Sequence, residues 1–291
     1  MSKFNIGNRL IGDGYPAFII AEIGNNHNGD FDMALALIDK AIECKADSVK
    51  FQVKNIEKAF PADLLDSPYS GPNSFGSTYR EHKQMLEFSH DEYRELKEYS
   101  DKKKIIFFAT PFDLDSVEFL LSIDVPAFKI ASFHITDEEL VRTLAKSHKP
   151  IIASTGMSSL EEIDRAVSII REEGTDFALL QCTSSYPTDD KDVHLSVINQ
   201  LQEKYNCVAG YSGHDRGITI AAASVCFGGK IIEKHFTLDR TLKGPDHAAS
   251  LEPKGLAGLV ERTRLIESAI GSPRKQVLEC ELKNRKKNRG Y

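Results

Sequence analysis

The sequence predicts one α/β domain folded as a (β/α)8 TIM barrel, on three observations. Eight short apolar segments of strand type alternate with helical patterns along the chain, and this alternation implies parallel strand pairing. The length of 291 residues suits eight such units closed into one barrel. No linker rich in Pro, Gly or Ser divides the chain, so we expect a single domain over residues 1–291. An open doubly wound sheet is the alternative fold.

The strand candidates are short apolar runs with polar residues near their carboxyl ends. They are residues 18–24, 47–52, 105–110, 127–132, 150–155, 177–183, 207–212 and 230–236. Helical patterns lie between them, and three residue pairs have the spacing of a capping box: Ser89 with Glu92, Thr136 with Glu139, and Ser158 with Glu161. Such a pair satisfies the free N–H groups of a helix start.

One segment, from about residue 53 to residue 88, is longer than a barrel loop needs to be. It contains the sequence PADLLDSPYSGPNSFGSTYR. Long insertions that follow a barrel strand often carry function. We therefore expect this segment to form a lid or one wall of the active site.

The composition indicates a globular protein without a polyanionic or membrane partner. Hydrophobic residues make up 41% and charged residues 27%, and the net charge is −6. This balance excludes neither a basic pocket nor a small anionic substrate, but it gives no reason to expect nucleic acid or membrane binding. There is no membrane-spanning or secretory pattern, and the five cysteines form no CxxC pair. We expect reduced thiols, a cytoplasmic location and a solvated basic tail over residues 283–290.

Charged side chains interrupt the apolar strands near their carboxyl ends, where barrel enzymes keep their active sites. Because side chains alternate faces along a strand, Val49 and Phe51 pack outward on helices and Lys50 points into the barrel. The charged set at this end comprises Glu22, Lys50, Lys129, Glu233 and His235. Each alone is compatible with a structural ion pair. Together they indicate a functional site, because buried charges are costly unless they are paired.

Hydroxyl groups lie at or just beyond the ends of the same strands: Thr110, Ser132, Ser154, Ser184 and Ser212. Lysines and hydroxyls together suit phosphate or carboxylate oxygens. The sequence contains neither GxGxxG nor GxxxxGK[ST], so a nucleotide loop is not expected. The combination predicts a small, enclosed anion.

Two histidines, His214 and His235, end or follow consecutive predicted strands. Neighbouring strand tips lie about 5 Å apart, so both imidazoles can reach one divalent metal ion. Two protein ligands leave positions open for substrate and water. A hydrogen-bonded core role for these histidines is the alternative. We also expect His27 to face the site, and we expect the other histidines in polar contexts to be solvated: His82, His90, His148 and His194.

Nine motifs occur in a fixed order: AEIGNNHNGD, SVKFQ, FFATPFD, FKIAS, STGMSSLEEI, QCTSSYPT, GYSGHD, EKHFTLDR and GPDHAASLEP. Together they resemble the sialic acid synthase family, the N-acetylneuraminate synthases and their relatives. The resemblance runs from about residue 18 to about residue 265. It implies a phosphoenolpyruvate-condensing barrel that uses a divalent metal, Mn²⁺ or Mg²⁺, and an N-acylated aldose. It also implies a possible homodimer.

The resemblance assigns roles to individual positions. The phosphoenolpyruvate group comprises Lys50, Thr110, Lys129, Ser132, Ser154, Ser184 and Ser212. The metal ligands are His214 and His235, and Glu22 lies near the reacting centre as a base or as a positioning group. The sugar side comprises Gln52, Tyr186, Glu233 and Asp246. Among these residues, Glu22, Lys129, His214 and His235 are the catalytic candidates.

The acceptor sugar and the type of activity are both left open by the sequence. Many family members continue into a small antifreeze-like domain after the barrel, and residues 1–291 are expected to contain none. The exact acceptor sugar is therefore left open. The rival activities are a Schiff-base aldolase with Lys129 as nucleophile and a synthase for a deoxy-aldulosonate phosphate. A non-catalytic barrel that binds a sugar is the non-enzyme alternative.

Overall fold

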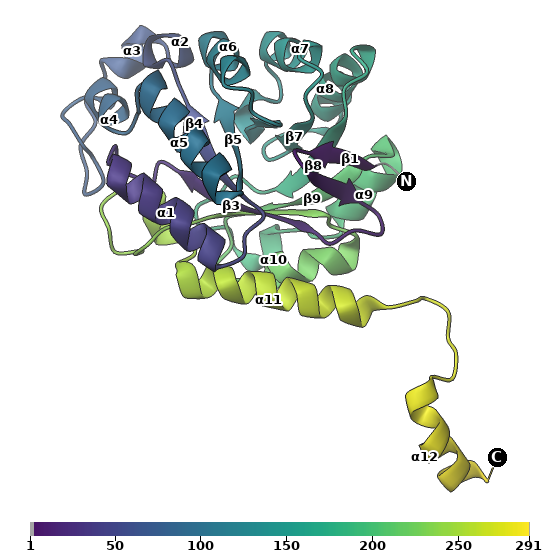
Figure 1. Cartoon of the computed structure of the whole chain (residues 1–291). Helices are drawn as coiled ribbons and strands as arrows, with labels where there is room; N and C mark the ends of the chain where they lie inside the picture. The colour runs from purple at the N-terminus through teal and green to yellow at the C-terminus, as the bar shows by residue number, and fades with distance from the viewer. Residues whose placement is uncertain (1–2, 291) are drawn as a thin grey trace.

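The computed structural model describes residues 3–290, and its centre is a closed barrel of eight parallel strands (Figure 1). The strands are β3 (Phe18–Gly24), β4 (Ser48–Val53), β5 (Ile106–Pro111), β6 (Phe128–Ile130), β7 (Ile151–Ser154), β8 (Phe177–Cys182), β9 (Val208–Gly213) and β10 (Ile231–His235). They close in the order β10-β3-β4-β5-β6-β7-β8-β9. The predicted fold class is confirmed, and the open sheet is excluded.

A helix follows each barrel strand and covers the outside of the barrel. These helices are α1 (Phe31–Glu43), α5 (His90–Lys103), α6 (Leu114–Ser122), α7 (Glu138–Lys146), α8 (Leu160–Glu172), α9 (Val197–Tyr205), α10 (Thr219–Ala223) and α11 (Pro253–Ile270). Phe51 of β4 packs outward, with its ring centroid 5.3 Å from that of Phe107 and 6.4 Å from that of Tyr93 in α5. The predicted alternation of β4 is thereby confirmed, and it turns Lys50 toward the barrel interior.

Short 3-10 helices punctuate the loops: η1 (Ser132–His134), η2 (Asp190–Asp192), η3 (Ser224–Phe227) and η4 (His247–Ala249). The cysteines are free thiols, as expected, with Cys44, Cys182 and Cys207 buried and Cys226 and Cys280 exposed.

One of the three predicted capping boxes is confirmed, and the observed helix starts correct the other two. The box formed by Ser89 and Glu92 is present at the start of α5. The other two predictions are wrong by one residue, because Asp137 caps α7 and Ser159, paired with Glu162, caps α8. In both places a second capping residue directly follows the predicted one, and the buried face of the helix selects the later start.

A hairpin that the sequence did not predict precedes the barrel. It consists of β1 (Lys3–Ile6) and β2 (Arg9–Gly12), and Gly7 in its turn has a φ of +56°, which favours glycine. Arg9 of β2 forms an ion pair with Asp47 (2.7 Å), which directly precedes β4. The hairpin therefore lies at the amino-terminal end of the barrel, opposite the predicted site.

The long segment after β4 contains three short helices, α2 (Ile56–Ala59), α3 (Ala62–Leu65) and α4 (Tyr79–Met85). His82 of α4 is 1% exposed and stacks on Tyr69 with ring centroids 4.5 Å apart. The expectation that His82 is solvated is wrong, because the aromatic residues of the segment enclose it. Burial lowers the pKa of His82 to about 4, which keeps the imidazole neutral near pH 7.

The carboxyl-terminal part leaves the barrel. After α11 an extended linker leads to α12 (Glu279–Arg289), which lies away from the barrel in Figure 1. No residue of α12 is buried, so the expected solvated tail is helical over much of its length. None of the described helices is long and apolar enough to cross a membrane.

Candidate active site

A cavity of about 350 Å³ opens at the carboxyl ends of the barrel strands. Most of the predicted site residues line it: Glu22, Lys50, Gln52, Thr110, Lys129, Ser132, Ser154, Ser184, Tyr186, Ser212, His214 and Glu233. These residues come from strands and loops all around the barrel. The fold therefore gathers side chains as far apart in the sequence as Glu22 and Glu233.

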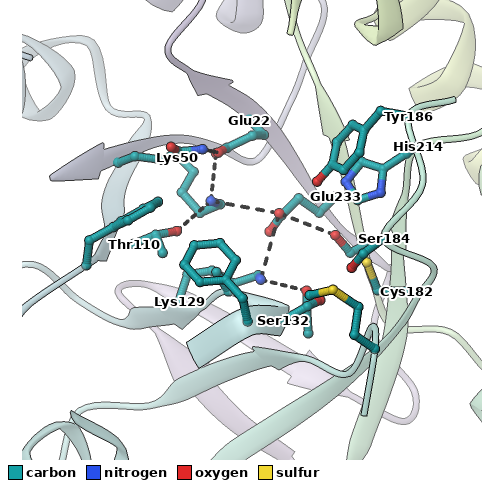
Figure 2. Close-up of a pocket in the computed structure, with 17 residues that line it drawn as sticks. Glu22, Lys50, Thr110, Lys129, Ser132, Cys182, Ser184, Tyr186, His214 and Glu233 are labelled. Carbon is teal, nitrogen blue, oxygen red and sulfur yellow. Dashed lines mark hydrogen bonds and ion pairs between the residues drawn. The ribbon is translucent and has the colours of Figure 1, made fainter. Parts of the chain in front are cut away.

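Lys50 lies at the base of this cavity and is almost completely buried. Its Nζ atom is 2.7 Å from Glu22 Oε2 and 3.8 Å from Glu233 Oε1, and it donates to Thr110 Oγ1 at 2.8 Å. Figure 2 shows Lys50 and Lys129 pointing toward the Glu233 carboxylate from neighbouring parts of the barrel. The pairing of Lys50 with two carboxylates accounts for its tolerated burial.

Lys129 approaches the same carboxylate from β6. Its Nζ atom donates to Ser154 Oγ (2.6 Å) and to the Ile130 carbonyl (3.0 Å), and it lies 3.9 Å from Glu233 Oε1. Burial lowers the pKa of Lys129, and the charge of Glu233 partly offsets this effect. For Glu233, burial is the largest single effect and raises the pKa, but the charges of Lys129, Lys50 and the two nearby histidines together lower it, and the net shift is downward.

Hydroxyl groups surround the lysines because the backbone comes close at Gly156. Ser132 Oγ accepts a hydrogen bond from the Gly156 N–H at 3.0 Å. A Cβ atom at Gly156 would lie 2.4 Å from Ser184 Oγ and 2.8 Å from Ser132 Oγ, so any side chain there would displace these hydroxyls. Glycine at this position therefore allows the two hydroxyls to converge.

The two predicted metal ligands meet at the edge of the cavity. The ring centroids of His214 and His235 are 5.7 Å apart. The Nδ1 atom of His214 lies 2.9 Å from the Thr183 carbonyl, which only accepts, so Nδ1 carries the proton and Nε2 keeps its lone pair. Burial and the nearby His235 lower the pKa of His214 to about 4, so the ring is neutral near pH 7.

These features fit a divalent cation held by two imidazoles. A carbonyl that orients the far nitrogen of a ligand histidine is usual in metal sites. The buried Nδ1 of His235 has no hydrogen-bond partner among the described residues, which leaves this nitrogen free to bind a metal ion. No cluster of three or more His, Cys, Asp or Glu side chains suited to a metal occurs within residues 3–290.

Three of the four residues predicted to face the sugar line the cavity: Gln52, Tyr186 and Glu233. Gln52 Nε2 donates to Glu22 Oε1 at 3.0 Å, and Tyr186 lies beside His214 with ring centroids 3.9 Å apart. Asp246 does not line the cavity, but Asn25 links it to Gln52, with its Nδ2 atom 3.4 Å from an oxygen of each. His235 and Asp246 thus adjoin the cavity rather than line it.

Sequence reasoning missed several residues of the site and misplaced others. Five missed residues also line the cavity: Phe112, Ala131, Phe133, Met157 and Cys182. Phe133 and Tyr186 are 51% and 59% exposed, and they give the mouth an aromatic rim. The five missed residues lie in or beside the FFATPFD, FKIAS, STGMSSLEEI and QCTSSYPT motifs, which was the available signal.

Two predictions about the surroundings are wrong. His27 does not face the cavity, because its buried ring stacks on Phe88 with centroids 4.1 Å apart. None of the cavity residues comes from the segment between Lys54 and Phe88. The segment instead contacts the loop that follows β10, where Lys243 Nζ lies 4.7 Å from the centroid of the Phe75 ring.

Comparisons with known proteins agree with this site. Residues 37–275 match the NeuB family model. The chain belongs to the NeuB family. It is 46% identical over 275 residues to N-acetylneuraminate-9-phosphate synthase of Homo sapiens, covering 94% of this chain and 77% of that protein. It is 39% identical to N,N'-diacetyllegionaminic acid synthase of Campylobacter jejuni, covering 91% of this chain and 81% of that protein.

A solved structure extends the likeness to three dimensions. The N-acetylneuraminic acid (sialic acid) synthetase of Leptospira borgpetersenii, in complex with citrate, is 39% identical and superimposes with a TM-score of 0.87. The match covers 100% of this chain and 98% of that one. The family resemblance and the barrel fold are therefore confirmed. The single-domain organisation, the homodimer and the cytoplasmic location stay predictions.

Proposed function

We propose that this NeuB-family protein condenses phosphoenolpyruvate with an N-acylated aldose to give a nonulosonic acid and inorganic phosphate. The observation that carries the proposal is the convergence of Lys50 and Lys129 in a hydroxyl-lined cavity beside two imidazoles. The names of the relatives support it, because they are synthases of sialic and legionaminic acids. The product class is therefore the better supported part, and the residue roles are our assignment.

Lys50 and Lys129 are assigned to the phosphate and carboxylate of phosphoenolpyruvate. Both ammonium groups already donate to hydroxyls, Thr110 and Ser154, which would help them to orient an anion. Ser132, Ser184 and Ser212 are assigned as further hydrogen-bond donors to the phosphate. Because Glu22 and Glu233 lie near these lysines, the site needs further positive charge to hold a trianion.

A divalent cation on His214 and His235 would supply that charge and would polarise the aldehyde of the acceptor. In the condensation, the methylene carbon of phosphoenolpyruvate bonds to the aldehyde carbon. Water then adds to the former enol carbon, and phosphate leaves with cleavage of its C–O bond. Glu22, held by Lys50 and Gln52, either accepts the proton of this water or positions the aldehyde.

Gln52, Tyr186, Glu233 and Asp246 are assigned to the acceptor on the family resemblance, and three of them line the cavity while Asp246 adjoins it through Asn25. The relatives differ in product. Two of them make a 9-phosphate and a diacetyl legionaminic acid, respectively. The acceptor of this protein is accordingly an N-acetylmannosamine-type sugar in our proposal, with its phosphorylation left to experiment.

The test is phosphate release from phosphoenolpyruvate in the presence of Mn²⁺, across a panel of free and phosphorylated aldoses, with and without chelator. Release that requires both an aldose and the metal supports the proposal and identifies the acceptor. Release of phosphate without metal would contradict the assignment of His214 and His235 as ligands of a catalytic metal. No release with any sugar in the folded, metal-loaded protein contradicts the synthase function.

One observation favours a Schiff-base aldolase as second candidate: burial lowers the pKa of Lys129, and a nucleophilic amine must be neutral. Borohydride reduction in the presence of pyruvate separates the two activities. A covalent adduct on Lys129 would support the aldolase. Metal-dependent release of phosphate without an adduct would exclude it.

A further inference from the structure

A buried ion pair lies directly behind the two histidines and faces away from the active-site cavity. Lys234 precedes His235, and Asp215 follows His214 in the sequence. The Nζ atom of Lys234 is 3.0 Å from Asp215 Oδ1, and the two side chains are 1% and 0% exposed. Neither side chain lines that cavity. Burial of a charge pair seldom stabilises a protein in itself. Stability alone therefore does not explain why this ion pair lies next to both histidines.

The strand register shows what this pair contributes. β9 and β10 pair at Ile232 with Tyr211, at Glu233 with Ser212 and at Lys234 with Gly213. His235 continues in the ladder by pairing with Glu22 of β3. His214 lies one residue beyond the last pair between β9 and β10, so the sheet does not fix its distance from His235.

Lys234 supplies the missing link between the two strand ends. It donates to the Asp215 backbone carbonyl at 2.6 Å, in addition to the side-chain contact. Tyr211 donates from its hydroxyl to Asp215 Oδ1 at 2.7 Å. The chain immediately after His214 is thereby attached to β10 by Lys234 and to β9 by Tyr211.

Gly213 is required for this arrangement. A Cβ atom at position 213 would lie 2.3 Å from Tyr211 Cε1 and 2.5 Å from Asp215 Oδ1. On the other side, the Thr188 N–H donates to the His214 carbonyl at 3.1 Å. That contact attaches His214 to the loop after β8 and not to β10, so it does not set the separation of the two histidines.

We propose that the Lys234–Asp215 ion pair is a positioning pair that sets the separation of the His214 and His235 rings and thereby the affinity for a divalent metal. The inference rests on the proposed function, because it takes these two histidines as the metal site. Lys234 acts through the backbone that carries them and touches neither the metal nor the substrate.

The test is Mn²⁺ binding to the Lys234→Met variant without substrates, followed by the electron paramagnetic resonance signal of free Mn²⁺. Methionine keeps the apolar part of the side chain and removes the ammonium group with both donated hydrogen bonds. We expect a dissociation constant about 10- to 100-fold higher than that of the wild type, the usual effect of losing an outer partner of a metal site. We also expect a changed visible absorption spectrum after Co²⁺ substitution, which a purely structural role would not produce.

Two further variants separate positioning from stability. Lys234→Met alone leaves Asp215 buried without its cation, whereas the Lys234→Met/Asp215→Asn double variant removes both charges. We expect the double variant to regain part of the lost melting temperature and to keep the weak Mn²⁺ affinity. Arg264→Met removes the partly buried contact with Asp47 (3.1 Å) at the opposite end of the barrel. We expect it to lower the melting temperature and to leave Mn²⁺ affinity unchanged.

The outcomes are distinct. If the two Lys234 variants bind Mn²⁺ as tightly as the wild type, the positioning inference is wrong and the metal site stands. If the wild type binds no Mn²⁺, or if His214→Ala binds it equally well, the proposed metal site fails and the inference fails with it. If Arg264→Met weakens binding as much as Lys234→Met does, the effect is one of general stability and the inference is overturned.

Discussion

At the scale of single residues, the two active-site lysines carry the argument for an anionic substrate. Lys129 is fully enclosed and donates to Ser154 and to a backbone carbonyl. Replacement by methionine keeps the apolar part of the side chain and removes the charge. Because a charge-assisted hydrogen bond contributes about 1.5–3 kcal/mol, we expect Lys129→Met to raise the KM for phosphoenolpyruvate about 10- to 100-fold. Steady-state kinetics at saturating acceptor measure this change, and an unchanged KM would contradict the assignment.

The environment of Lys129 also predicts a pH dependence. Burial lowers the pKa of Lys129 below its ordinary value, and the charge of Glu233 raises it again in part. The ammonium therefore loses its charge as the pH rises through this lowered pKa, and affinity for phosphoenolpyruvate falls there. Removing the negative charge in Glu233→Gln lowers the pKa of Lys129 further. We expect calorimetric titration without sugar to show the loss of affinity beginning at lower pH in the variant. A shift to higher pH would contradict this account.

The residue scale also shows what the sequence could and could not predict. Alternation along strands was enough to place Lys50 and Glu233 inside the barrel, because the direction of a strand side chain follows from its position. It did not predict Phe133 at the mouth or Asn25 between Gln52 and Asp246, since loop residues follow no period. His82 was misjudged because its polar sequence neighbours gave no sign of the aromatic rings that enclose it.

At the scale of elements, the first and last residues of the long segment after β4 are joined to each other by hydrogen bonds and an ion pair. Glu87 accepts from the Lys54 backbone N–H (3.1 Å) and from Tyr93 (2.9 Å), and it forms an ion pair with Lys54 Nζ at 3.5 Å. The Tyr93 hydroxyl also lies 2.6 Å from the Gln52 carbonyl oxygen, so its single proton is shared between the two acceptors. This network explains how a long excursion leaves the end of β4, and thus Gln52, in place.

The same network predicts that removing the Glu87 carboxylate strongly lowers the free energy of unfolding. Glu87→Ala leaves the Lys54 ammonium buried with no carboxylate within ion-pair distance. We expect a loss of about 3–5 kcal/mol in the free energy of unfolding, measured by urea denaturation. Glu57→Ala is the matched control, because it breaks an exposed pair with Arg80 in the same segment and should cost less than about 1 kcal/mol. Equal losses of stability in the two variants would show that Glu87 does not hold the two ends of the segment together.

At the scale of the whole molecule, the barrel is stabilised by a buried core, whereas the carboxyl-terminal helix α12 buries none of its residues. The barrel core is one continuous cluster of buried side chains that extends from Phe4 to Val260. Every residue from Gly271 to Gln276 is exposed, and α12 has no buried residue. The repeated strand–helix pattern predicted this closed core, whereas the path of the linker follows from no periodic pattern.

This difference predicts that the barrel does not need the end of the chain for its stability. A protein that stops after Ile270 loses no buried apolar side chain, so its free energy of unfolding should change by less than about 0.5 kcal/mol. Thermal and urea denaturation of the shortened and full-length chains, with sedimentation velocity on both, measure this. An unchanged stability and an unchanged oligomeric state would show that the barrel is independent of α12. A lower melting temperature together with a shift to a smaller assembly would instead show that α12 is buried against a second copy, because removing the helix then also removes the association that stabilises the chain.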